Sequence, residues 1–284
     1  MENHKIINAS FKYRNLSNLL FKSIVFGLSS LTLIPLVAIF SYMIYKGLSA
    51  WNIDLFTQLP QPVGSAHSGI SNAILGSLQI ISIASLIAIP LGIAIGIYLY
   101  EFKKDRLNMW VRLSMNILQG VPSIIIGIVS YVWIVLPLNS FSALSGGIAL
   151  SIMMLPVIAR STEETMALVP NTYKEASLAL GVPYFKTIRK VILKCAKNGI
   201  NTGIILSLAR ITGETAPLLF TAFGNQFMSL NPFKPINAIP LVIFNYATSP
   251  YKEWQDIAWG AALLLILFIF ILSIGAKILG KKHE

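Results

Sequence analysis

Long apolar stretches, separated by short polar segments, run along most of the chain. A helix needs about 20 mostly apolar residues to cross the hydrocarbon core of a bilayer. Six stretches meet or approach that length, at 23–45, about 73–98, 113–136, 144–159, 199–221 and 257–276. The pattern therefore predicts an all-α membrane protein with six transmembrane helices.

The first apolar stretch follows a basic segment, as the core of a secretory signal does. It is much longer than the roughly 7–15 residues of such a core. We therefore expect residues 1–22 to be a tail and 23–45 to be a retained first helix. A helical domain follows over 70–277, and residues 278–284 form a second tail.

Lysine and arginine collect on one side of the predicted helices. The N-terminal tail holds four of them, the second connection four, the segment 160–198 seven and the C-terminal tail three, against three on the other side. Cytoplasmic segments of membrane proteins carry this excess. The distribution predicts that both termini are cytoplasmic.

Composition narrows the class of protein further. Apolar residues make up 55% and charged residues 12% of the 284 positions, against about 25% charged in ordinary soluble domains, which excludes that class. The net charge of +11 would suggest nucleic-acid binding in a soluble protein. Here the cytoplasmic segments account for it, so we expect no nucleic-acid partner. The one cysteine, Cys195, excludes an intrachain disulfide and a cysteine-based metal cluster.

The longest cytoplasmic connection, 160–198, has the pattern of short helices. Two spacings, Ser161 to Glu164 and Thr172 to Glu175, match the capping box in which a hydroxyl and a carboxylate begin a helix. The pattern predicts a helix that starts at Thr172.

Glycine and proline mark the end of that helix. Gly181 suits the left-handed cap that ends a helix, Pro183 follows as a stop, and a basic amphipathic helix starts near Tyr184. On local chemistry alone, such a helix pair either lies on anionic lipid headgroups or docks a cytoplasmic partner.

Part of this connection resembles the EAA loop of permease subunits in ABC importers. The residues that carry the likeness are Glu175, Ala176, Ser177, Gly181, Val191, Ile192 and Leu193. The family pattern is Glu-Ala-Ala, three residues, Gly, nine residues and Ile-x-Leu-Pro. Here Ser177 replaces an alanine and Lys194 replaces the proline. The resemblance implies the ABC importer type I permease fold, with this loop forming coupling helices that bind an ATPase subunit.

One predicted span carries two charges, Arg210 and Glu214. A charge inside a span costs about 2.5–3.5 kcal/mol on insertion scales, so it indicates function by default. Residues four apart share a helix face, and this face continues with the small residues Gly203 and Ser207. The pair is either a structural lock between helices or a point where the guanidinium meets a tetrahedral oxyanion.

The string Gly213-Glu-Thr-Ala-Pro-Leu-Leu-Phe220 resembles a signature of the PstA-type permeases of bacterial phosphate importers. The signature residues are Gly213, Thr215, Ala216 and Pro217. The resemblance implies that Arg210, Glu214 and Arg160 are translocation residues. Arg160 also fits an ordinary basic anchor at the cytoplasmic end of a span.

The same resemblance implies a complex in the bacterial inner (plasma) membrane. Its other members are a PstC-like homologous permease, a PstB-like ATPase dimer and a PstS-like phosphate-binding protein. This chain would form half of the translocation pathway of an ATP-driven phosphate importer.

The sequence gives no sign of an enzyme. It has no P-loop, and its three histidines lie outside the predicted spans. We therefore expect no cofactor or metal in this chain, with ATP and magnesium bound by the partner ATPase.

Two other functions stay open. A permease for sulfate or molybdate would carry the same coupling loop, so only residues 208–220 favour phosphate. An ion-coupled secondary transporter or a membrane-embedded sensor would have no reason for that loop.

Two smaller features complete the pattern. Gly92 and Gly96 have the spacing of small residues that lets helices approach closely, which makes them candidates for a subunit interface. The stretch 238–246 is apolar but too short to span, and we expect an interfacial helix or an outer lid there.

Overall fold

The computed structural model of the chain describes residues 2–65 and 67–281. Every named element in these ranges is a helix, which confirms the all-α class. The predicted tails extend to Met1 and to 282–284, and those residues lie outside the described ranges.

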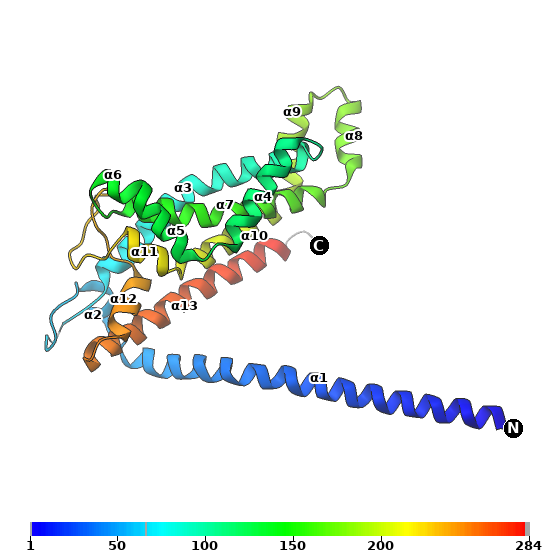
Figure 1. Cartoon of the computed structure of the whole chain (residues 1–284), viewed down its shortest axis with the longest axis horizontal. Helices are drawn as coiled ribbons and strands as arrows, with labels where there is room; N and C mark the ends of the chain where they lie inside the picture. Colours follow the sequence, from blue (N-terminus) through cyan, green and yellow to red (C-terminus); the bar gives the residue numbers. More distant parts are fainter. Residues whose placement is uncertain (1, 66, 282–284) are drawn as a thin grey trace.

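Helix α1 (Glu2–Ser49) runs through the predicted N-terminal tail without a break. Figure 1 shows it leaving the other helices and extending alone. Its last turns pack on α13 (Lys252–Lys281), where Gly47 lies against Leu263 and the Tyr42 ring meets that of Trp259 at 5.2 Å. The apolar side chains from Leu19 to Leu48 are largely exposed, so the rest of the described chain does not cover them.

Three further long helices pack with α13 into the body of the molecule. They are α3 (Ser71–Glu101), α7 (Ala143–Ala167) and α10 (Leu193–Thr212). The central apolar cluster joins α3 to α7 and includes Ile80, Ala84, Leu150, Met154 and Ile158.

Glycines let α3 and α7 approach closely. A Cβ on Gly92 would lie 2.8 Å from the Cβ of Ile158, and one on Gly96 would lie 2.5 Å from that of Thr162. Their spacing thus serves packing inside this chain, and the expectation that they form a subunit interface is wrong.

The single helix predicted over 113–136 is also wrong. The structure has α4 (Arg106–Gly120) and α5 (Ser123–Ser130), bent by 107° at the break. Pro122 stands at the bend, where it has no N–H to donate and its ring excludes a continuous helix. After α5, the chain continues through a π-helical segment, Tyr131–Val135, into α6 (Leu136–Leu138).

The helix predicted over 199–221 is interrupted as well. Helix α10 ends at Thr212, and α11 (Ala216–Thr221) follows after three residues. In a continuous helix the ring of Pro217 would clash with the carbonyl of Gly213, four residues earlier, and glycine itself weakens a helix interior. The break therefore falls inside the string 213–220.

The two ends of the molecule differ. Helices α2 (Ile53–Thr57), α6 and α12 (Ile239–Ala247) lie at one end, while α8 (Asn171–Ala179) and α9 (Tyr184–Thr187) project at the other (Figure 1). Helix α12 occupies the short apolar stretch expected over 238–246 and packs on α13 and α3.

Four helices among the described residues have the length and apolar character of membrane spans, namely α1, α3, α7 and α13. The bent pair of α4 with α5 to α6 raises the number to five if it crosses as one span. Helix α10 carries three basic residues and is not among them.

Candidate functional site

The predicted coupling loop forms a helical hairpin at one end of the molecule, which we call the coupling hairpin (171–192). Helix α8 ends at Ala179, Gly181 adopts a left-handed backbone conformation with φ of 76°, and α9 begins at Tyr184 after Pro183. A π-helical segment, Ile188–Ile192, then leads directly into α10. Gly181 adopts this φ at little cost because it has no Cβ.

The two predicted capping boxes do not form. Ser161 and Glu164 lie inside α7, which runs on to Ala167. Helix α8 starts after Pro170, without a side-chain cap, and the side chain of Glu175 is exposed. Pro170 occupies the N-cap position with ψ of 136°, and its missing N–H is tolerated there because the helix makes no use of it.

Ser177, which replaces an alanine of the family pattern, has a partner across the hairpin. Its hydroxyl lies 2.9 Å from the hydroxyl of Thr187, and both side chains are buried. A buried hydroxyl without a hydrogen bond is costly. The departure from the pattern is therefore matched by Thr187, a partner that the sequence pattern alone did not identify.

The coupling hairpin presents an apolar surface that this chain does not cover. Leu178, Leu180 and Phe185 are 40%, 84% and 73% exposed. Glu175, Ala176 and Gly181 are exposed on the same hairpin, whereas Val191 and Leu193 are half-buried against the apolar cluster beneath it. Exposed apolar residues gathered in one place are typical of a surface that binds a partner.

Arg210 and Glu214 meet at the break between α10 and α11. Arg210 Nε lies 4.0 Å from Glu214 Oε1, and their side chains are 54% and 21% exposed. Glu214 stands after the end of α10, so the two residues come together across a helix end and not along one helix face. Gly213 and Thr215 lie in this break, and Ala216 and Pro217 begin α11. The Arg210 guanidinium is exposed on the surface of the chain.

Arg160 lies elsewhere, near the end of α7. Its Nε is 2.7 Å from Glu164 Oε1, and both side chains are largely exposed. Beside it, the Arg112 guanidinium forms a two-point ion pair with Glu163, at 2.5 and 3.2 Å, which joins α4 to α7. Arg112, Arg160 and Glu163 line one small cavity. In the sequence, Arg112 is only one of the basic residues of the second connection, because nothing in its local pattern marks a partner 51 residues away.

The register of α7 and α10 separates the two candidate arginines. Gly203 faces Ser161, and Gly199 faces Thr165, so the helices are antiparallel. Arg210 lies about seven residues beyond Gly203, which is about 10 Å along the axis. Arg160 and Arg210 therefore stand at different depths and do not form a single site.

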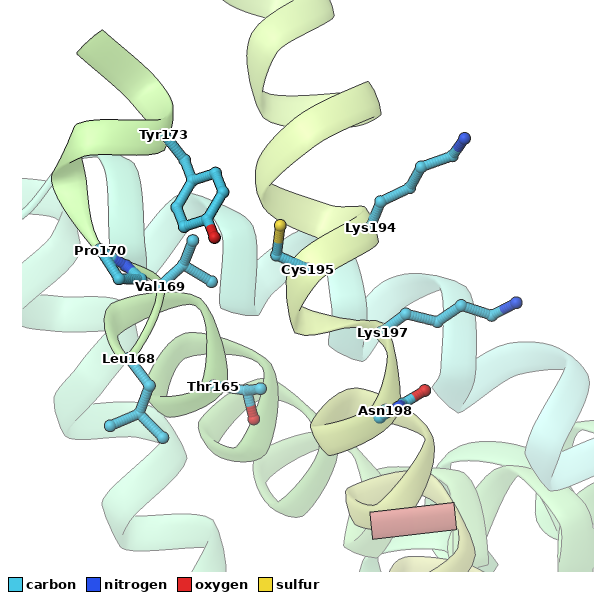
Figure 2. Close-up of a pocket in the computed structure, with 9 residues that line it drawn as sticks. All are labelled: Thr165, Leu168, Val169, Pro170, Tyr173, Lys194, Cys195, Lys197 and Asn198. Carbon is cyan, nitrogen blue, oxygen red and sulfur yellow. The ribbon is translucent and has the colours of Figure 1, made fainter. Parts of the chain in front are cut away.

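A cavity of about 800 Å³ opens where α7 and α10 diverge toward the coupling hairpin. Figure 2 shows Tyr173 and Cys195 on its opposite walls, with Thr165 and Asn198 deeper, while Lys194 and Lys197 extend outward. The cavity separates the first turn of α8 from the start of α10. Cys195 is exposed there, within reach of solvent.

The fold resembles solved ABC transporters. A chain of the MetNI methionine ABC transporter in an inward-facing conformation superposes with a TM-score of 0.63 at 19% identity, over 74% of this chain and 94% of that one. A chain of a bacterial ABC transporter involved in the import of the polysaccharide alginate gives 0.57 at 14% identity, over 90% and 96%. The helical body, the broken spans and the projecting hairpin thus have the fold of these ABC transporter chains.

Sequence comparison narrows the class to a family. A profile described as "Binding-protein-dependent transport system inner membrane component" matches residues 88–283. The phosphate transport system permease protein PstA of Xylella fastidiosa is 44% identical over 244 residues, 85% of each chain. That of Haemophilus influenzae is 39% identical over 276 residues, 95% of this chain and 96% of the relative. The chain belongs to the PstA family of permease proteins. Members of this family are multi-pass inner-membrane components of transporters and not enzymes.

Proposed function

We propose that this chain is a membrane subunit of an ATP-driven phosphate importer and forms half of its translocation pathway. The observation that carries the proposal is the identity of 39–44% with permeases named for phosphate transport, over 85–95% of the chain. The family profile matches residues 88–283 and so covers the string 213–220. This evidence favours phosphate over sulfate or molybdate, and over an ion-coupled transporter.

In this proposal, Arg210 meets phosphate as the anion crosses the membrane. The guanidinium has several donors in a plane, which match a tetrahedral oxyanion. Glu214, 4.0 Å away, orients the guanidinium and limits its hold on the anion. A pathway must release what it binds, so a limited affinity of Arg210 for the anion suits transport. Arg160, about 10 Å nearer the coupling hairpin, would receive the anion at a later step.

In this proposal, the coupling hairpin binds an ATPase subunit and transmits its movement to the membrane helices. Its uncovered Leu180 and Phe185 fit a docking surface, and Glu175, Ala176, Ser177, Gly181, Val191 and Leu193 shape it. The complete complex would contain a PstC-like permease, a PstB-like ATPase dimer and a PstS-like binding protein. ATP and magnesium would bind in the ATPase.

We also propose six spans with both termini in the cytoplasm. Helix α10 packs between α7 and α13, and its 20 residues reach about 30 Å, enough to cross the hydrocarbon core. The start of α1, the end of α13 and the coupling hairpin lie toward the same end of the molecule (Figure 1). The basic residues concentrated at that end support its cytoplasmic side.

Uptake by the reconstituted complex tests the substrate. Proteoliposomes containing both permeases and the ATPase, supplied with the binding protein, should accumulate radiolabelled phosphate only with internal ATP and magnesium. Unlabelled phosphate should compete, and sulfate or molybdate should not. Uptake of sulfate or molybdate by the complex, or uptake driven by an ion gradient without ATP, would refute the proposal.

A further inference from the structure

Glu101, the last residue of α3, lies against the coupling hairpin. Its side chain is 8% exposed. Its Oε2 accepts a hydrogen bond from the hydroxyl of Tyr184 and lies 3.5 Å from Lys174 Nζ. Lys174 Nζ in turn donates a hydrogen bond of 2.6 Å to the Tyr184 oxygen. We call these three residues the Glu101 cluster.

The carboxylate of Glu101 depends on these two partners. It stands at the carboxyl end of α3, where the helix dipole disfavours a negative charge. Its second oxygen, Oε1, is buried without a hydrogen-bond partner among the described residues. A buried charge is stable only when it is paired or hydrogen-bonded. Lys174 and Tyr184 supply that pairing.

The cluster ties both arms of the coupling hairpin to one point of the body. Lys174 belongs to α8 and Tyr184 begins α9. Other side-chain hydrogen bonds of 171–187 in the described structure stay within the hairpin. Below the cluster, Ile188 and Ile192 continue the contact with α3 through an apolar cluster.

We propose, on the basis of the transport function above, that Glu101, Lys174 and Tyr184 are positioning residues that make α3 move with the coupling hairpin. An ATPase that moves the hairpin would then pull α3 directly, and not only α7 and α10 through the chain. Helix α3 packs along α7 through Gly92 and Gly96, so its movement reaches the core of the bundle.

Near neutral pH, Tyr184 and Lys174 both keep their protons, and this keeps the hydrogen bonds of the cluster intact. Burial, and then the hydrogen bond to Glu101, raise the pKa of Tyr184. Burial lowers the pKa of Lys174, but the hydrogen bond to Tyr184 and the charge of Glu101 outweigh it and leave that pKa raised. The stabilisation from a raised lysine pKa is complete below the unfolded value of about 10.4 and is lost as the pH rises through the folded value.

The test compares Tyr184→Phe with Tyr173→Phe in the complete reconstituted complex. Both substitutions remove a hydroxyl from the coupling hairpin, but in the described structure the Tyr173 hydroxyl makes no hydrogen bond. We expect Tyr184→Phe to lower the phosphate transported per ATP hydrolysed by about tenfold or more, the order expected for losing a hydrogen bond to a charged group. Tyr173→Phe should match the wild type. Glu101→Gln, which keeps an acceptor for Tyr184, should fall between the two.

Three measurements separate the possible outcomes. ATPase co-purification and the thermal stability of the complex should stay at wild-type levels in Tyr184→Phe. An unchanged ratio of phosphate to ATP would overturn the inference, and so would a loss of ATPase binding or stability that accounts for the lost uptake. If the wild-type complex itself carries no phosphate, the proposed function fails instead, and the ratio for any transported oxyanion still tests the cluster.

Discussion

Arg210 is the residue on which the proposed transport path depends most directly. It stands at the end of α10 with its side chain 54% exposed and its nearest acid, Glu214, at the outer limit of an ion pair. A structural lock would hold the two charges closer together and bury them, because a screened, exposed pair contributes little to stability. The geometry therefore suits a guanidinium that is available to a passing anion.

Replacing Arg210 by alanine should reduce phosphate uptake by at least about tenfold while the complex still assembles, because the planar donors that match the anion are lost. Arg210→Lys keeps the positive charge but lacks the planar donors of the guanidinium, so it should recover only part of the uptake. Uptake is measured in proteoliposomes, and assembly by co-purification of the ATPase. Wild-type uptake by Arg210→Ala would remove this residue from the pathway.

The Ser177 and Thr187 hydroxyls form a second pair whose effect can be measured. Restoring the family alanine, by Ser177→Ala, leaves the Thr187 hydroxyl buried without its partner and should cost about 1–3 kcal/mol. Thr187→Val should cost a similar amount. The double variant should cost less than the sum of the two, because both polar groups are then gone. Thermal unfolding of the purified complex measures each value, and strict additivity would show that the two hydroxyls do not interact.

At the scale of the element, the two interrupted helices pack against each other where they break. Helix α5 follows the bend at Pro122, α11 follows the break before Pro217, and the two short helices pack side by side. A Cβ on Gly127 would lie 2.7 Å from the Cα of Pro217, so glycine makes this contact possible. The contact holds the segment that carries the 213–217 break against the bent pair.

Gly127→Ala should therefore destabilise the protein by about 1–3 kcal/mol, since the added methyl meets backbone that cannot easily move. Gly120→Ala is the matched control, because a Cβ there meets no atom within 4 Å. Both variants gain the higher helix propensity of alanine, so their difference reports the contact. Equal melting temperatures for the two purified variants would contradict the close packing of α5 on α11.

At the scale of the whole molecule, the coupling hairpin and the long helices meet around the cavity in Figure 2. Tyr173 of α8 and Cys195 of α10 stand on opposite walls of this space of about 800 Å³. A closing movement of the hairpin toward α10 would narrow it. Because the chain has one cysteine, Cys195 is a natural reporter of that movement.

We expect a water-soluble maleimide to label Cys195 more slowly, by about threefold or more, when the complex is held closed with ATP and vanadate than without nucleotide, because thiol reactivity follows exposure. Mass spectrometry of this chain measures the rate, and Cys195→Ser provides the background. Equal rates in the two states would show that α8 and α10 move as one body.

Local chemistry was sufficient to predict several features of the fold and the site. The apolar stretches predict the all-α class, and Gly181 with Pro183 predicts the turn of the coupling hairpin, since a left-handed φ and a missing N–H are properties of single residues. The hairpin itself has the expected two helices. The capping boxes failed because a spacing permits such hydrogen bonds but does not start a helix where α7 already runs through Ser161.

Amino-acid sequence by itself determined which segments are apolar, where the charges lie and which residues resemble the family, because these are properties of composition and spacing. Tertiary structure decided the rest. It set the angle of 107° at the bend beside Pro122, packed α5 against α11, and showed that Gly92 and Gly96 serve internal packing. It also paired Ser177 with Thr187 and Glu101 with Tyr184. The first pair lies across the coupling hairpin and the second joins residues 83 apart, and only the packing of the helices brings these groups within hydrogen-bond distance.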